Sequence, residues 1–317
     1  MKRISTVAAV LAAAVFLSAP RLCSGQAAPA RAALNVITTT SDLGSLAQEV
    51  GGDKVNVTSL AKGYQDPHFV EAKPSFMLLL NKAQLLVVIG RELEIAWLPP
   101  LITQSRNARI QPGADGYLDA SQNVKILDMP TGAITRAMGD VHPSGNPHYW
   151  LDPENAGRIA KALEGKLSEL DPGNAAYYKA RGENFERRLT EAQKRWKAQM
   201  APYRALKVVT YHRSWPNFAG AFGLDVVGYV EPKPGIPPSP SHTLDLIRQM
   251  KRDNVKLIII EPYFDPKTPN SIGSQTGAKV VTLAPSVGGE KELTDYFKLF
   301  DSDIAKLVAA IKAAGVK

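Results

Sequence analysis

The sequence predicts an α/β protein with two lobes, each with a mainly parallel sheet flanked by helices, bridged by one long rigid helix. Short apolar runs alternate with amphipathic stretches from Leu34 onward, and the same rhythm returns after Leu206. Strands that alternate with helices favour parallel sheets whose faces are covered. Between the two regions lies a charge-rich, helix-forming stretch without an internal proline, and 317 residues are enough for two domains.

The first lobe is assigned to residues 33–165. Its apolar and amphipathic runs follow one another at the spacing of short strands and helices. In order they are LNVITTT, DLGSLAQEVGG, KVNVTSL, SFMLLLNKA, QLLVVIG and LEIAWLPPLI.

The linking helix is assigned to residues 166–203. Asp152 and Pro153 resemble an N-cap followed by proline at the first helical position, which opens one helix. Asp171 and Pro172 mark a second start, followed by about 28 residues of helix-forming sequence. At 1.5 Å per residue such a helix is about 40 Å long, enough to run the length of a domain.

The second lobe is assigned to residues 204–317. A proline-rich segment within it, EPKPGIPPSPS, is short and is expected to be an ordered loop. The strand-like and helix-like runs of this lobe are KVVTYH, WPNFAGAFG, DVVGYV, HTLDLIRQMKRDN, VKLIIIEP, GSQTG and KVVTLAP, with a last helix from about Lys291.

The first 26 residues have the pattern of a cleaved signal peptide. A basic start precedes an apolar run of roughly a dozen residues and a region of small residues, with cleavage expected between Gly25 and Ala33. The bulky Leu22 before Cys23 argues against lipid attachment. We therefore expect a secreted, periplasmic protein.

The composition limits the kinds of ligand and metal site that the chain can form. The net charge of +8 falls by three, to about +5, without the signal residues Lys2, Arg3 and Arg21, and no block of like charge indicates nucleic-acid binding. Cys23, the only cysteine, lies in the signal segment, so disulfides and thiolate metal sites are excluded from the mature chain. Any transition-metal site must use His, Asp or Glu.

Three of the five histidines lie where ligands bind in parallel α/β proteins, beyond strand ends or at the lobe junction. His68 follows a proline after a strand, His212 follows the strand KVVTY directly, and His148 precedes the helix that leaves the first lobe. Three imidazoles and one oxygen make a tetrahedral zinc site. His142 is either an auxiliary ligand or a solvated loop residue, and His242 is expected to be structural at a helix start.

Four motifs resemble the metal-specific solute-binding proteins of ABC transporters, the zinc and manganese receptors called cluster A-I. They occur in the order of that family, and the resemblance runs from about Leu34 to the C-terminus. The resemblance implies two α/β lobes bridged by a long helix, with the metal held between them. The motifs are DPH with KPS following, NPHYWLDP, YHRSWPNFAGAFGL and IIIEPYF. Trp97, Trp150 and Trp215 flank these motifs and are expected to pack between lobe and helix.

The resemblance implies that His68, His148 and His212 are the metal ligands. Zinc receptors of the family usually have histidine at the third of these positions, and manganese receptors usually have glutamate. The resemblance therefore favours Zn²⁺ over Mn²⁺ as the bound cargo, in agreement with the preference of imidazole for zinc.

The fourth ligand is where the sequence departs from the family. Many members have an aspartate in the loop after a late strand of the second lobe, where this chain has Ala284 or Pro285. Glu261 is the nearest acidic candidate for a metal ligand, with Asp265 and water as alternatives. Glu261 could equally accept a hydrogen bond that orients an imidazole.

The predicted function is high-affinity periplasmic zinc binding and delivery to an inner-membrane ABC permease. The chain is expected to be a monomer and not an enzyme, with a periplasmic metallochaperone as a further candidate partner. The alternative is a secreted zinc-dependent hydrolase that uses the same three histidines, with Glu261 as general base. The chain has no HExxH helix and no GxSxG motif, which argues against hydrolysis. A structural domain or adhesin with an incidental metal is a third possibility.

Overall fold

The computed structural model describes residues 32–132, 138–139 and 141–316. The predicted signal segment, residues 1–26, lies outside this range. Contacts separate residues 1–32 from a unit formed by Ala33–Lys317, and the description below concerns that unit alone. Within the described residues, no helix has both the length and the hydropathy needed to cross a bilayer.

The first lobe contains a parallel sheet with the strand order β2-β1-β3-β4. Val36 at the centre of β1 is paired with Val57 on one side and Leu85 on the other. The strands are β1 (Leu34–Thr38), β2 (Val55–Ser59), β3 (Leu85–Val88) and β4 (Tyr117–Asp119), and the helices are α1 (Ser41–Gly51), α2 (Pro74–Asn81) and α3 (Leu98–Gln104).

The second lobe repeats this topology, with the order β6-β5-β7-β8 and all pairs parallel. Its strands are β5 (Lys207–Thr210), β6 (Asp225–Tyr229), β7 (Leu257–Ile260) and β8 (Lys279–Thr282), and its helices are α6 (Pro216–Phe222), α7 (Pro240–Arg252), α8 (Lys267–Thr276) and α9 (Tyr296–Ala313). The predicted fold class is therefore confirmed.

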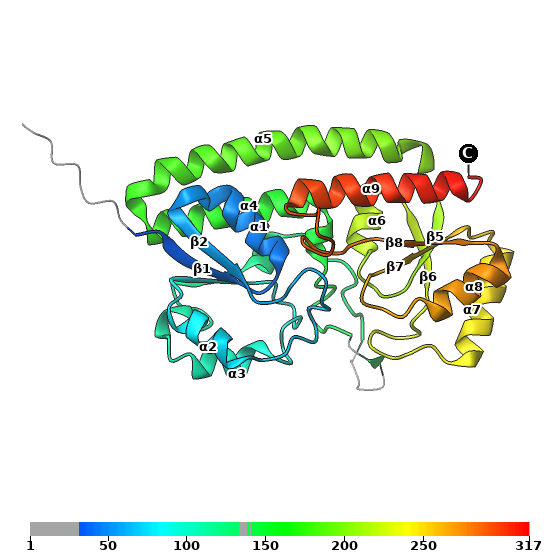
Figure 1. Ribbon diagram of the computed structural model, residues 1–317, viewed down its shortest axis with the longest axis horizontal. Coiled ribbons are helices and arrows are strands. Elements are labelled where there is room, and N and C mark those ends of the chain that lie inside the picture. Colours follow the sequence, from blue (N-terminus) through cyan, green and yellow to red (C-terminus); the bar gives the residue numbers. More distant parts are fainter. Residues whose placement is uncertain (1–31, 133–137, 140, 317) are drawn as a thin grey trace, which may run out of the picture. The chain divides into compact units, whose positions relative to one another are not determined.

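Two helices lie between the two sheets along the chain. Asp152 caps α4 (Pro153–Leu170), as expected, because its side chain accepts a hydrogen bond from the Glu154 backbone. The long helix α5 (Ala175–Met200) has 26 residues and runs past both sheets in Figure 1. It packs against α1, α4 and α9.

The second helix start expected at Asp171 and Pro172 is present, and its first turn is a 3₁₀ turn. The Asp171 carboxylate accepts hydrogen bonds from Asn174 and from the Tyr178 hydroxyl and caps no backbone amide. Pro172 opens a short 3₁₀ turn, and α5 begins only after it.

The strand order determines where a ligand can bind. In each sheet the second strand lies on one side of the first strand and the third strand lies on its other side. The direction in which strands are added therefore changes at β1 in one lobe and at β5 in the other. Ligands of open parallel sheets bind beyond the carboxyl ends of the strands at such points. The loops that leave β2, β5, β6 and β7 at their carboxyl ends carry most of the polar residues described next.

Candidate metal centre

Three imidazoles from distant parts of the chain meet in one place. His68, His148 and His212 are 8%, 2% and 7% exposed, and each offers a ligand atom within 4.8 Å of the other two. Their ring centroids are separated by 5.2 to 5.4 Å. The convergence expected from the sequence is present in the fold.

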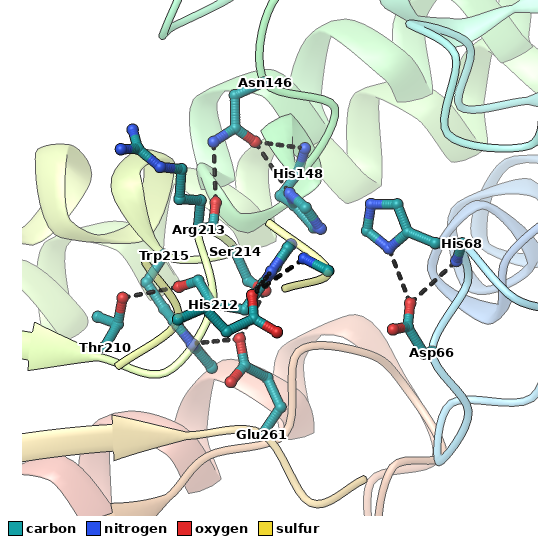
Figure 2. Close-up of polar contacts among 12 residues, drawn as sticks. Asp66, His68, Asn146, His148, Thr210, His212, Arg213, Ser214, Trp215 and Glu261 are labelled. Carbon is teal, nitrogen blue, oxygen red and sulfur yellow. Dashed lines mark hydrogen bonds and ion pairs between the residues drawn. The ribbon is translucent and has the colours of Figure 1, made fainter. Parts of the chain in front are cut away.

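The first two histidines are held by the same local device. Asp66 Oδ1 accepts hydrogen bonds from the backbone N of His68, at 3.0 Å, and from its ring Nδ1, at 2.7 Å. Asn146 Oδ1 does the same for the backbone and ring of His148, both at 2.9 Å. In each case a proline separates the acceptor from the histidine, and its fixed φ stiffens the turn. Figure 2 shows both pairs.

The third histidine is held by a residue from the neighbouring strand. His212 lies just beyond β5, and Glu231, just beyond β6, contacts its Nδ1 at 2.7 Å. Burial disfavours the charged imidazole, but the hydrogen bond to Glu231 and the charges of Glu261 and Asp66 outweigh it, so the pKa of His212 is raised. Sequence reasoning missed Glu231 because 19 residues separate it from His212.

These contacts leave the Nε2 atoms for a ligand. Each Nδ1 already faces an acceptor, which fixes the tautomer and the ring orientation. His148 Nε2 is buried and has no hydrogen-bond partner among the residues that the structure describes. Burial, together with neighbouring imidazoles, holds the pKa of His148 well below its usual value, so this ring is neutral and its lone pair can bind a cation.

A fourth imidazole adjoins the group. His142 Nε2 lies 3.2 Å from His68 Nε2, and the two ring centroids are 5.3 Å apart. Burial, then the neighbouring His68 and His212, lowers the pKa of His142 to about 3. A cavity of about 540 Å³ is lined by His142, His148 and His212 and opens to solvent. It offers an ion a path to the imidazoles.

The two acidic candidates for the fourth ligand, Glu261 and Asp265, differ in burial. Glu261, at the end of β7, is fully buried, and its Oε1 accepts hydrogen bonds from Ser214 and from the Trp215 indole. Its Oε2 has no partner in the described part of the chain, and burial raises its pKa to about 7. Glu261 is not in the three-residue group defined above. Asp265 is exposed and paired with Lys267, so the structure does not bring it to the histidines.

The three tryptophans support the site loops as well as packing. All three are buried, and each indole N–H is donated to a segment of the site. Trp97 donates to the carbonyl of Pro67, Trp150 to that of Pro285, and Trp215 to Glu261. Ala284 or Pro285 lies where the family aspartate was expected, and the bond from Trp150 holds this loop through its backbone.

The fold and this centre define a class. Two lobes with parallel sheets, a long connecting helix and a buried group of imidazoles between them are the features of helix-bridged solute-binding proteins. Residues 36–310 match the family model described as "Zinc-uptake complex component A periplasmic". The chain therefore belongs to this family, and the resemblance seen in the sequence is confirmed.

Known relatives cover nearly the whole chain at low identity. The "High-affinity zinc uptake system protein ZnuA" of Yersinia pestis is 25% identical over 300 residues, which cover 89% of each chain. The "Manganese ABC transporter substrate-binding lipoprotein PsaA" of Streptococcus pneumoniae is 24% identical and covers 98% of this chain and 99% of its own. The relatives thus include receptors described for zinc and for manganese.

Solved structures agree with the fold. A zinc-bound deletion mutant of ZnuA has a TM-score of 0.74 and 27% identity, covering 88% of this chain and 98% of its own. The solute-binding protein FpvC of Pseudomonas aeruginosa, in complex with Mn²⁺, has a TM-score of 0.75 and 26% identity, covering 89% of this chain and 99% of its own. The hydrolase alternative gains no support from these comparisons.

Proposed function

We propose that this chain binds zinc in the periplasm and delivers it to an inner-membrane ABC permease. The observation that carries the proposal is the group of three buried imidazoles, His68, His148 and His212, each with its Nδ1 held by an acceptor. Neutral imidazole nitrogens suit Zn²⁺, whereas oxygen-rich ligand sets suit Mn²⁺. The ion is cargo, so a closed ligand shell serves retention and no open position for a substrate is needed.

Two side chains compete for the fourth coordination position. Two ligands of one tetrahedral zinc, each about 2.05 Å from the ion, lie about 3.3 Å apart. The separation of 3.2 Å between the Nε2 atoms of His142 and His68 fits this value. Glu261 remains the carboxylate candidate through its unpartnered Oε2. Its contacts with Ser214 and Trp215 equally suit a residue that supports the loop carrying His212.

The remaining parts of the proposal concern compartment and partners. The signal pattern of residues 1–26 supports export, and a receptor of this family requires a membrane permease to receive its metal. A monomeric receptor without enzymatic activity, loaded directly or by a periplasmic metallochaperone, completes the proposal.

Elemental analysis of the purified protein, followed by competition titration of zinc against manganese, tests the ligand set. We expect one zinc per chain, with loss of high-affinity binding in His68→Ala, His148→Ala and His212→Ala. His242→Ala is the matched control, because its ring is hydrogen-bonded to the carbonyl of Tyr229 and lies outside the group. Unchanged zinc affinity in the three variants, or tighter binding of manganese by the wild type, would refute the proposal.

The same titration on His142→Ala and Glu261→Gln identifies the fourth ligand. If His142 binds the ion, only the first variant weakens zinc binding strongly, and if Glu261 binds it, only the second does. Equal affinities in both would assign the position to water. Turnover of ester or peptide substrates that disappears in His212→Ala would instead establish a hydrolase.

A further inference from the structure

A strained turn in the first lobe lies directly beside the segment that carries His142. Gly90, Arg91 and Glu92 have φ values of 73°, 52° and 61°, so three successive residues adopt the left-handed conformation. Residues other than glycine adopt this conformation rarely, and it persists only where surrounding contacts enforce it. Such strain often marks a functional element.

Both Arg91 and Glu92 of this turn contact Ser144. The Glu92 carboxylate accepts hydrogen bonds from the Ser144 hydroxyl, at 2.8 Å, and from its backbone N, at 3.3 Å. Arg91 donates to the Ser144 carbonyl at 3.3 Å, and its guanidinium is in turn fixed by the hydroxyl of Ser121 at 3.0 Å. The turn therefore forms hydrogen bonds with the backbone N–H, the backbone carbonyl and the hydroxyl group of Ser144.

His142 is held between this turn and the metal centre. Its Nε2 faces His68 Nε2 at 3.2 Å, and the backbone of Arg91 is near enough to its ring to act on its pKa. The carbonyl of His142 accepts a hydrogen bond from the backbone of Gly145, so Ser144 lies within a closed turn with His142. Ser144 and His142 thus belong to one hydrogen-bonded turn.

We propose that Glu92 is a positioning residue, which holds His142 beside His68 through Ser144 and thereby slows the release of the bound ion. The inference rests on the proposed metal-binding function and adds a determinant outside the ligand set. A ligand that is already in place before the ion arrives loses less conformational entropy on binding and returns to the ion more quickly.

Zinc release to an excess of a fluorescent chelator tests the inference. We expect Glu92→Ala and Ser144→Ala to speed zinc release about tenfold, in keeping with the effect of residues that orient metal ligands. His142→Ala should speed release by a similar factor. The double variant Glu92→Ala/His142→Ala should release zinc no faster than His142→Ala, because both changes remove the same interaction. Glu92→Gln, which keeps the shape of the side chain and one carbonyl acceptor, should be intermediate.

The matched control is Glu71→Gln. Glu71 is an exposed carboxylate of the same lobe, and its oxygen lies 3.8 Å from the Lys73 ammonium group. Additive effects in the double variant, or release from Glu92→Ala at the wild-type rate, would overturn the proposal. So would an unchanged release rate in His142→Ala, since no imidazole would then be positioned for retention.

A second measurement on the metal-free protein separates this inference from the proposed function. Carbethoxylation of His142 by diethyl pyrocarbonate, followed by peptide mass spectrometry, should be faster in Glu92→Ala and Ser144→Ala than in the wild type and Glu71→Gln. Equal reactivity would refute the positioning role even if zinc binds. A wild-type protein that binds no zinc but shows the reactivity difference would refute only the proposed function.

Discussion

At the residue scale, the candidate metal centre contains the same short hydrogen-bonded turn at two of its histidines. An Asx residue two positions before a histidine accepts from both its backbone and its ring, with a proline between them. The two copies differ in charge, because Asp66 supplies a carboxylate and Asn146 an amide. A carboxylate partner makes an imidazole a more basic ligand, so His68 should bind a cation more strongly than His148 does.

Replacing Asp66 tests the contribution of charge against that of geometry. Asp66→Asn loses the charge but keeps an acceptor of the same shape, and we expect zinc affinity to fall about tenfold. Asp66→Ala loses both the charge and the acceptor, and zinc affinity should fall by up to about 100-fold. Competition titration measures both, with the exposed Asp115→Asn as control. Equal affinities for the asparagine and alanine variants would show that hydrogen-bond geometry contributes nothing.

Protons are expected to compete with zinc at His212. A protonated imidazole cannot bind a metal, and the contact with Glu231 helps raise the pKa of His212 above its ordinary value in spite of burial. As pH falls, zinc affinity should therefore begin to drop above the ordinary histidine pKa. In Glu231→Gln this drop should move to lower pH, while affinity at pH 8 decreases. Titrations between pH 5 and 8 measure the shift, and a drop that stays in place or moves upward would contradict the assigned role of Glu231.

Much of this centre could be predicted from single residues, and some of it could not. The DPH and NPH motifs contain ligand candidate and acceptor within three residues, so both are visible in the sequence. The contact of His142 with His68 joins residues 74 positions apart and depends on the strained turn at Glu92. No local pattern encodes such an approach.

At the element scale, α5 is the structural support of both lobes. One face of this helix is buried along its length, and in its middle Phe185 is fully buried against Phe297 of α9. Most of the helical stability of such an element comes from this packing and not from intrinsic propensity.

Phe185→Ala should therefore destabilise the protein without altering its site. We expect the free energy of unfolding to fall by about 3 to 5 kcal/mol, the usual cost of removing a buried phenylalanine. Denaturant unfolding of the metal-free protein measures this, and zinc stoichiometry should be unchanged because α5 contributes no ligand. Arg187→Ala, on the exposed face of the same helix, should change stability by no more than about 0.5 kcal/mol. A similar loss in both variants would show that packing is not the cause.

The elements themselves were predictable where their apolar patterns were long. The strand-like runs of both lobes contain strands, and a long helix links them, because short continuous apolar runs and long amphipathic stretches differ in length and pattern. The three-residue β4 was missed, since a strand of that length carries no measurable alternation. The start of the long helical segment at Pro172 was predicted, but the 3₁₀ form of its first turn was not.

At the scale of the whole unit, a second connection joins the lobes besides the helices. Asp42 at the start of α1 accepts a hydrogen bond from the backbone of Val287, and the neighbouring Ser41 donates to the carbonyl of the same residue. Gly63, five residues before His68, packs so closely on this loop that a Cβ atom would lie 2.0 Å from the Val287 carbonyl oxygen. The loop after β8 thus packs directly on the loop that carries His68.

The protonation of Asp42 should make the junction sensitive to pH. Burial raises the pKa of Asp42 from 3.8 to about 7, because the hydrogen bonds from Val287 and Ser286 only partly offset desolvation. The folded state therefore binds the proton more tightly than the unfolded state, so the contribution of this group to stability is greatest at low pH and is lost as pH rises through the window from about 4 to about 7. Glu94, with a pKa raised to about 7 by burial, contributes in the same direction.

Asp42→Asn isolates this contribution, because the amide cannot ionise and its oxygen still accepts from Val287. Denaturant unfolding of the metal-free wild type should show a lower free energy at pH 8 than at pH 5, and the variant should reduce that difference by on the order of 3 kcal/mol. Asp115→Asn should leave the difference unchanged. A wild-type protein that gains stability from pH 5 to 8, with the same gain in Asp42→Asn, would show that this carboxyl group is ionised in the folded state at low pH and that the junction is held by a buried charge.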